Sequence, residues 1–551
     1  MEEILENKAG KKVILLGNEA IVRGALESGV QFVSTYPGTP ASEIGNTFYR
    51  IAKKAGIYFE FSTNEKVALE AGVGASFSGL KTLVAMKNFG LNVALDALLP
   101  FVYTGTKGPT VIVVADDPSC HSSAQSEENS RAAAFLAHIP ILEPADPKEC
   151  KEFVKLAFQV SEKFKIPVIV RTTTRVAHQR ASVTLGEIPN SKSQIPKFVK
   201  DTHRFVTLPP RVLEMKQELL EKLAKIQKLF EESPLNKTDR GPSSIHAKRG
   251  IVTSGVSYLY VREALKDLNL SLPVLKLDFF YPLPEKNIKS FIRGLNKVLV
   301  VEELEPYLEK EVERLAKEAN YRLKVIGKEL LPEVGELKPE IVTQAIAKFT
   351  NKKFRIKNSL EIRNLKLEIP RRTPQLCPGC PYWLVFNGVK KAVNEKEVIF
   401  GGDIGCYMLA GLPPHNIQDY LSCMGSSIGI AHGIKKATAG KQKLITFIGD
   451  STFFHSGIPP LVNAVFNQSN PLVIILENET TAMTGHQPHP GASATGDKLK
   501  IENIVRALGI KNLKIIDPVN QEEFIKTVKD FINKKEVSVI LARRPCIQLK
   551  K

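Results

Sequence analysis

Residues 444–451 read Leu-Ile-Thr-Phe-Ile-Gly-Asp-Ser, an apolar run that ends in a glycine and an acid. A second apolar run at residues 472–476 leads to Asn478-Glu479-Thr480, and 27 residues separate Asp450 from Asn478. Two short apolar runs joined by a segment long enough for a helix are typical of a parallel sheet. The two stretches therefore predict an α/β fold with polar side chains at the carboxyl ends of neighbouring strands, where such sheets bind ligands.

These polar side chains suit a magnesium site. Asp450 and Asn478 carry the hard oxygen atoms that Mg²⁺ prefers, and Gly449 allows a diphosphate to approach the backbone because it has no side chain. The plainer interpretation is an ordinary turn after a strand, with Asn478 as a turn residue. The residues alone leave both interpretations open.

The same alternation of apolar runs and helical periodicity extends over most of the chain, which predicts parallel sheets covered by helices. We expect Asn18 to cap the first helix, and Thr63 or Asn64 to cap a helix from Glu65 to about Phe77. Further strands are expected at residues 13–16, 32–34, 82–86, 110–115, 250–253, 273–277 and 298–301.

The length of 551 residues predicts several domains. We expect an α/β domain at residues 1–188, a basic helical linker at 189–248, a smaller α/β domain at 249–350, a connector at 351–375 and a third α/β domain at 376–551. The linker contains one amphipathic helix, with an apolar face formed by Val212, Met215, Leu219, Leu223, Ile226 and Phe230.

Composition and charge restrict the class of protein. Hydrophobic residues are 43% and charged residues 24%, as in soluble globular proteins. No apolar run approaches the roughly 18 residues of a membrane span, and the N-terminus resembles no secretory signal, so we expect a cytoplasmic protein without a membrane partner. The net charge of +18 favours anionic partners. Aromatic residues are only 7% and the basic linker has few, which argues against a nucleic-acid partner.

Six longer motifs occur in order along the chain. They are Tyr36-Pro37-Gly38-Thr39-Pro40, Asn64-Glu65-Lys66-Val67-Ala68, residues 115–123, Leu376-Cys377-Pro378-Gly379-Cys380-Pro381, residues 449–457 and residues 478–488. Together they resemble the thiamine-diphosphate-dependent 2-oxoacid:ferredoxin oxidoreductases, in particular large (alpha) subunits of the indolepyruvate type. Because the resemblance covers nearly the whole chain, it is far more specific than a single glycine-rich loop.

The resemblance implies two thiamine-diphosphate-binding-type parallel-sheet domains that flank a smaller domain like the C-terminal domain of transketolase. Residues 1–188 would form the pyrimidine-type domain and residues 376–551 the diphosphate-type domain. It also implies that Asp450 and Asn478 bind Mg²⁺ through their side chains and Thr480 through its carbonyl oxygen. The further cofactor contacts that it implies are Gly402, Asp403, Cys406, Cys423, Met424, Gly425, Gly449, Ser451, Thr452, Thr484 and Gly485.

Thiamine chemistry also needs a carboxylate beside the aminopyrimidine ring, where it shifts the tautomer so that the exocyclic imine can remove the thiazolium proton. Glu65 resembles the family's residue for this catalytic task. Without the resemblance, an acid that interacts with a helix dipole is the simpler interpretation. Glu70 is the rival carboxylate, although it falls on a different face of the helix.

Substrate contacts are expected from two loops. Thr39 matches the family residue that faces the substrate carboxylate. His121 is either a substrate contact or a surface histidine. His486 and His489 are either ordered loop residues or participants in proton transfer.

The cysteines form the last predicted site. Cys377 and Cys380 have the spacing of iron or zinc ligands. The resemblance implies that a 4Fe-4S cluster is bound by four thiolates, from Cys377, Cys380, Cys406 and Cys546. The alternative is that they are buried small apolar side chains. The other three cysteines have no partner spacing and are expected to bind nothing through sulfur; they are Cys120, Cys150 and Cys423.

The implied activity is oxidative decarboxylation of an aryl 2-oxoacid, such as indolepyruvate, to an acyl-coenzyme A, with electrons passed to ferredoxin. The resemblance implies a smaller (beta) subunit and a homodimer of this chain. Large subunits of this type usually end in a ferredoxin-like domain with two C-x2-C-x2-C-x3-C-P runs, and residues 1–551 contain no such run. We therefore expect the chain to lack that domain and to use a separate ferredoxin or ferredoxin-like subunit. A non-oxidative thiamine-dependent 2-oxoacid decarboxylase is the alternative.

Overall fold

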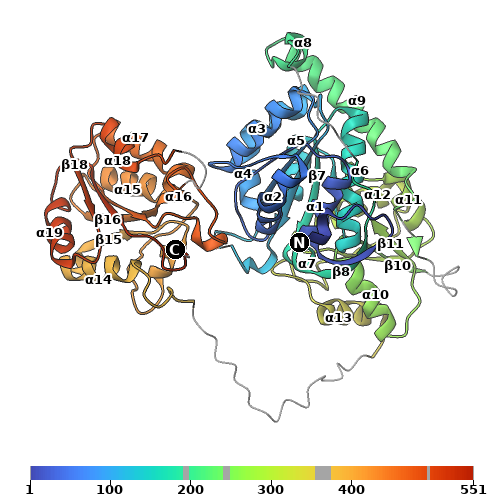
Figure 1. The fold of residues 1–551 in the computed structure, drawn as a ribbon. Coiled ribbons are helices and arrows are strands. Elements are labelled where there is room, and N and C mark those ends of the chain that lie inside the picture. The colour runs from blue at the N-terminus through green and yellow to red at the C-terminus, as the bar shows by residue number, and fades with distance from the viewer. Residues whose placement is uncertain are drawn as a thin grey trace. The chain divides into compact units, whose positions relative to one another are not determined.

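The computed structural model describes residues 2–123, 125–189, 198–236, 238–239, 248–353, 374–492 and 497–549. The chain divides into two compact units, Met1–Lys366 and Leu367–Lys551 (Figure 1). Both contain parallel sheets flanked by helices, so the predicted α/β class is confirmed. The predicted boundaries at 188 and 249 lie inside the first unit and stay predictions. Most of the connector (354–373) and parts of the linker (190–197, 237 and 240–247) lie outside the described residues.

The first unit is built on a seven-stranded sheet of order β12-β6-β7-β5-β4-β2-β3. Every residue of β5 is buried, which explains why this strand is continuously apolar in the sequence. The strands are β2 (Phe32–Thr35), β3 (Tyr58–Phe61), β4 (Thr82–Lys87), β5 (Thr110–Asp116), β6 (Ile141–Leu142), β7 (Val168–Thr173) and β12 (Phe279–Tyr281). The helices around them are α1 (Gly17–Glu27), α2 (Ser42–Ala55), α3 (Glu65–Phe77), α4 (Asn88–Thr104), α5 (Arg131–Ala137), α6 (Pro147–Phe164) and α7 (Thr174–His178).

Two local expectations near the N-terminus need correction. β1 (Lys12–Leu16) does not join the parallel sheet but pairs antiparallel with β8 (Arg180–Thr184), because only one of its faces is buried. Helix α1 begins at Gly17, so Asn18 does not cap it; the buried Asn18 Nδ2 instead donates to the carbonyl oxygen of Pro40 at 2.7 Å. Asn64 does cap α3, accepting a hydrogen bond from the Val67 N–H at 2.9 Å.

A five-stranded sheet of order β14-β13-β10-β11-β9 forms the rest of the first unit. Its strands are β9 (Thr238–Asp239), β10 (Arg249–Ser254), β11 (Val274–Leu277), β13 (Lys297–Val301) and β14 (Lys324–Ile326). Its helices are α10 (Ser257–Asp267), α11 (Glu285–Ile292), α12 (Tyr307–Ala319) and α13 (Pro339–Thr350). Two further helices, α8 (Thr202–Phe205) and α9 (Arg211–Glu231), precede this sheet in the chain. The predicted amphipathic helix is α9, which packs against α4, α6 and α11 through its buried apolar face.

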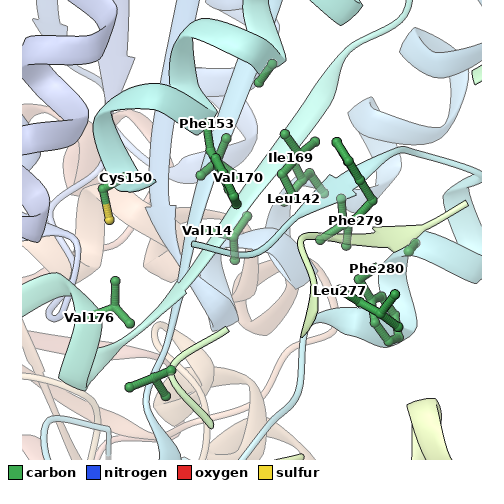
Figure 2. Packing of buried hydrophobic residues seen from close by; sticks show 14 of the residues in the cluster. Val114, Leu142, Cys150, Phe153, Ile169, Val170, Val176, Leu277, Phe279 and Phe280 are labelled. Carbon is green, nitrogen blue, oxygen red and sulfur yellow. The ribbon is translucent and has the colours of Figure 1, made fainter. Parts of the chain in front are cut away.

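Two features join the sheets of the first unit: the pairing of strand β12 and a group of buried charged side chains. Strand β12 follows β11 of the second sheet but pairs with β6 of the first, and Figure 2 shows Phe279 beside Leu142 there. Nearby, Arg131 donates to Glu143 and to Glu302, which follows β13, with all three bonds at 2.7 Å. These buried charges are paired, which offsets the free-energy cost of removing them from water.

The second unit contains one fully parallel sheet of order β15-β16-β17-β19-β18. Its strands are β15 (Val398–Gly401), β16 (Lys443–Gly449), β17 (Leu472–Glu477), β18 (Asn512–Ile516) and β19 (Ser538–Arg543). Residues of α14 (Tyr382–Ala392) and α19 (Gln521–Phe531) join one apolar cluster, and residues of α15 (Ser426–Ala437), α17 (Ile458–Phe466) and α18 (Ile501–Ala507) join another. Within the described residues, no helix combines the length and the apolar character needed to cross a bilayer.

Candidate active site

The carboxyl ends of β16 and β17 bring Asp450 and Asn478 together. The two strands pair in parallel with Gly449 opposite Leu476, and Asp450 begins the short helix α16 (Asp450–Thr452). Asp450 Oδ1 accepts the Ser451 N–H at 2.8 Å, while Oδ2 accepts the N–H groups of Asn478 at 3.0 Å and Glu479 at 2.9 Å. Both side chains are buried. The sheet edge therefore offers a carboxylate and an amide oxygen at one place, as the spacing predicted.

The third implied metal ligand and a histidine lie beside this pair. The Thr480 N–H donates to Asn478 Oδ1 at 3.1 Å, which fixes the orientation of the amide. The Gly491 N–H donates to His489 Nδ1 at 3.2 Å, so the imidazole carries its proton on Nε2. That Nε2 lies 3.2 Å from Asp450 Oδ2. Of the two interpretations of His489, its buried position against the carboxylate favours a role at the site. The oxygen donors fit a magnesium ion by their chemistry.

The Asp403 carboxylate accepts hydrogen bonds from the backbone of two loops. Its Oδ1 accepts the N–H groups of Ile404 and Gly425, both at 2.7 Å, and its Oδ2 accepts the Ser427 N–H at 2.9 Å. Burial raises the pKa of Asp403, and these hydrogen bonds oppose the shift. Gly425 has a φ of 85°, and an added Cβ would collide with Ser456. Asp403 and Gly425 thus hold the two loops that the resemblance places around the cofactor.

The other implied cofactor contacts surround Asp450 or lie on these loops. Thr452 Oγ1 donates to the Ile404 carbonyl oxygen at 2.9 Å, and an added Cβ on Gly449 would lie 2.6 Å from Cε1 of Tyr407. Ser451 Oγ accepts the Thr481 hydroxyl at 2.9 Å. Thr484 Oγ1 donates to Gln487 Oε1 at 2.6 Å, and the next residue, Gly485, has a φ of 120°. The Gly402 N–H donates to the Tyr420 carbonyl oxygen at 2.9 Å. Met424 is half-buried and Cys423 is exposed.

The four predicted cluster cysteines line one largely apolar cavity of about 110 Å³, together with Asn478 and His486. They are Cys377, Cys380, Cys406 and Cys546. None of the four is fully buried, which disfavours the alternative of buried small apolar side chains. Burial and the neighbouring thiols raise the pKa of Cys380 to about 11 and that of Cys406 to about 12.

The four cysteines share a cavity without converging on one point. Among the described residues, no three His, Cys, Asp or Glu side chains are close enough to share one metal ion. In a 4Fe-4S cluster each thiolate binds a different iron, so the four sulfurs surround a volume and need not meet at a point. The Cys546 N–H donates to the Asn478 carbonyl oxygen at 2.9 Å, so the cavity lies directly against Asn478. Cys120, Cys150 and Cys423 do not line this cavity.

In the first unit, burial distinguishes the two rival carboxylates. Glu65 begins α3 and is only 4% exposed, whereas the Glu70 side chain is 51% exposed and lies 3.8 Å from Lys66 Nζ. Gly90, in the first turn of α4, packs against Glu65, since an added Cβ would lie 2.8 Å from Glu65 Oε1. A buried carboxylate at the carboxyl edge of the sheet is the arrangement expected of Glu65, while Glu70 is a surface residue.

The two predicted substrate contacts differ in their surroundings. Thr39 lies in the loop between β2 and α2, at the edge that also holds Glu65, and its Oγ1 is 3.4 Å from Ser42 Oγ. His121 is a surface residue with a side chain 54% exposed, and its Nε2 lies 3.7 Å from Glu336. The geometry thus favours the surface interpretation of His121.

One residue at this edge was not identified from the sequence. Lys87 is the last residue of β4 and is largely shielded from water, although the rest of the strand is apolar. The available signal was a single cation at the end of an apolar run, which is also common at ordinary strand ends.

Three family models match the chain. They are the pyruvate flavodoxin/ferredoxin oxidoreductase thiamine diphosphate-binding domain at residues 23–228, the indolepyruvate oxidoreductase domain at residues 240–373 and the C-terminal thiamine pyrophosphate-binding domain at residues 403–542. Together with the parallel sheets and the buried Asp450 and Asn478 side chains at a sheet edge, these matches define a thiamine-diphosphate-dependent oxidoreductase.

The similar curated proteins narrow this class. The chain is 45% identical to the indolepyruvate oxidoreductase subunit IorA of Methanothermobacter thermautotrophicus, over 99% of this chain and 89% of that protein. It is 43% identical to the IorA subunit of Pyrococcus horikoshii, over 98% and 87% of the two chains. The 2-oxoglutarate synthase subunit KorA of Archaeoglobus fulgidus is 28% identical over 58% of this chain and 96% of its own. The chain belongs to the indolepyruvate oxidoreductase IorA family, and the resemblance drawn from the motifs is confirmed.

Proposed function

We propose that the chain catalyses the oxidative decarboxylation of an aryl 2-oxoacid such as indolepyruvate, transfers the acyl group to coenzyme A and passes the electrons to ferredoxin. The observation that carries this proposal is the cysteine cavity next to Asn478. Four thiols beside the oxygen ligands would give electrons an exit at the point where the cofactor is bound. The names of the IorA relatives support the substrate class.

Each part of the site has a role in this proposal. Asp450, Asn478 and the Thr480 carbonyl would hold Mg²⁺, and the loops fixed by Asp403 would enclose the cofactor. Bound thiamine diphosphate would supply a nucleophilic carbon for the ketone group and a thiazolium ring that takes up the electron pair left when CO₂ departs. Glu65 would hold a proton opposite the aminopyrimidine. The four cysteines would ligate a 4Fe-4S cluster as thiolates, so assembly of the cluster would release protons from Cys380 and Cys406, whose pKa values are high.

The activity would require partners. We infer a smaller beta subunit, because the relatives are named as subunits. We also infer two copies of this chain, since the resemblance places the pyrimidine-type and diphosphate-type domains opposite each other across a dimer. The electron acceptor would be a ferredoxin or a ferredoxin-like subunit. Such carriers are commonly acidic, and a net charge of +18 would attract them at low salt.

The cluster is tested by the iron content of the anaerobically purified chain. We expect about four irons per chain in the parent and a clear loss in Cys377→Ser, because one thiolate ligand is removed. Cys120→Ser is the matched control, since Cys120 belongs to the first unit and does not line the cavity, and it should keep its iron. A parent that binds thiamine diphosphate but contains no iron would contradict the cluster and would favour the non-oxidative decarboxylase.

A further inference from the structure

Lys87 lies at the predicted catalytic edge of the first unit and is largely shielded from water, and its side chain has neither a hydrogen bond nor an ion pair among the described residues. It ends β4 opposite Ala115 of β5, and its Nζ lies 4.6 Å from the centre of the Phe89 ring. Burial lowers the pKa of Lys87, although neighbouring acids oppose the shift. No hydrogen bond or ion pair joins its side chain to any other residue that the structure describes. A cation that is largely shielded from water and contacts only an aromatic ring favours an anionic ligand, so Lys87 is a candidate ligand-binding residue at this sheet edge.

The segments around Lys87 are those of the predicted active site. An added Cβ on Gly38 would lie 2.9 Å from Lys87 Cγ, so the loop that carries Thr39 runs along the lysine side chain. Glu65 acts on Lys87 electrostatically and packs against Gly90, three residues further along the chain. Lys87 therefore lies against the loop of Thr39 and within electrostatic reach of the Glu65 carboxylate.

The other carboxylates that act electrostatically on Lys87 accept hydrogen bonds from other residues. Asp117 accepts the Thr174 hydroxyl at 2.6 Å and the Ser122 N–H at 2.7 Å. Glu128 accepts from Asn92 Nδ2 at 2.9 Å. The charge of Lys87 is thus influenced by these carboxylates but not directly paired with them.

The first turn of α4 lies at the same edge of the sheet, and no side chain caps its backbone N–H groups. The helix begins at Asn88, no side chain caps it and its first turn contains no acidic residue. The Asn88 side chain is 0% exposed, and neither its Nδ2 nor its Oδ1 has a hydrogen-bond partner within the described part of the chain. A helix N-terminus with free N–H groups favours an anion, and the unpartnered amide is a second, independent sign of a missing ligand.

We propose that Lys87 and the first turn of α4 bind the carboxylate of the 2-oxoacid substrate. This assignment rests on the proposed function, because it takes Glu65 to face the cofactor at the same edge. A diphosphate is not required here, since the oxygen ligands for its magnesium are in the second unit. Every 2-oxoacid carries a carboxylate whatever its side chain, so a contact with Lys87 would separate 2-oxoacids from aldehydes and simple ketones of the same shape.

The test compares a carboxylate with its neutral amide in Lys87→Met. The probes are indole-3-propionate, which has no keto group and cannot react, and indole-3-propionamide. They are titrated by calorimetry into the full chain with any co-purifying small subunit, loaded with Mg²⁺ and thiamine diphosphate. We expect the parent to bind the carboxylate at least about 10-fold more tightly than the amide. Lys87→Met should lose this preference while its affinities for the amide and for thiamine diphosphate stay unchanged.

Two control variants make the result specific. Lys81→Met alters the lysine just before the same strand, at its opposite end, and should keep the preference. Lys87→Arg keeps the charge and should retain most of the preference for the carboxylate. The melting temperature of Lys87→Met should not fall, because the substitution removes a cation that is largely shielded from water and has no ion pair among the described residues.

A preference for the carboxylate that survives in Lys87→Met, or that is absent from the parent, would overturn the assignment. Failure of the parent to bind thiamine diphosphate would instead count against the proposed function. The two failures are distinguishable because the carboxylate titration is repeated without cofactor.

Discussion

Asp450→Ala is expected to weaken thiamine diphosphate binding by more than about 100-fold. We propose that Asp450 binds the metal directly, and loss of such a ligand should exceed the 10–100-fold typical of residues that only support ligands. The substitution removes both the charge for Mg²⁺ and the acceptor for three backbone N–H groups. Calorimetric titration of the variant with Mg²⁺ and thiamine diphosphate measures the effect.

A second variant separates the metal from the loop. Asp450→Asn keeps an oxygen acceptor for the backbone but lacks the charge, so it should still bind the cofactor far more weakly than the parent. Asp517→Ala is the matched control, because Asp517 is an exposed acid paired with Arg544 at 2.7 Å. Cofactor affinity that is unchanged in Asp450→Ala, in protein with an unaltered melting temperature, would remove Asp450 from the site.

Glu65→Gln is expected to retain the cofactor but to slow exchange of the thiazolium proton by about 10²–10⁴-fold, the usual contribution of acid–base catalysis. The amide has nearly the same shape but cannot drive the change of tautomer. Exchange of that proton into deuterated water, followed by NMR, measures the rate directly.

The matched control for this variant is Glu70→Gln, on the same helix but with an exposed side chain. It should exchange the proton at the parent rate. If Glu65→Gln also exchanges at the parent rate, Glu65 is only an acid at a helix N-terminus.

Much of the fold could be predicted because the buried residues of a strand or helix form a recognisable apolar pattern within a short stretch of sequence. The apolar run at residues 110–115 is a central strand buried on both faces, and Asn64 caps its helix through a bond to Val67 three residues away. The apolar run at residues 13–16 looks the same, yet β1 lies in a two-stranded ribbon with Ile14 62% exposed. Strand β12 joins the N-terminal sheet through pairing with distant residues, which no local pattern records.

Some residues of the candidate site could likewise be predicted from local sequence, and others could not. Asp450 and Asn478 follow apolar strands directly, so their meeting at one edge could be predicted, and the structure places them there. Lys87 has no motif around it, and it differs from an ordinary strand-end lysine only in being largely shielded from water without a hydrogen bond or ion pair to any described residue. The bonds between Arg131, Glu143 and Glu302 join residues that are far apart in the sequence, and each looks like an ordinary surface charge when read locally.

The most direct test of the proposed function is the number of electrons transferred per CO₂ released. The chain, with its co-purifying small subunit, Mg²⁺, thiamine diphosphate and coenzyme A, is given indolepyruvate under anaerobic conditions with a viologen dye as acceptor. Oxidative decarboxylation predicts two electrons in the dye for each CO₂, with formation of the acyl-coenzyme A. Release of CO₂ with an unreduced dye and an aldehyde as product would contradict it.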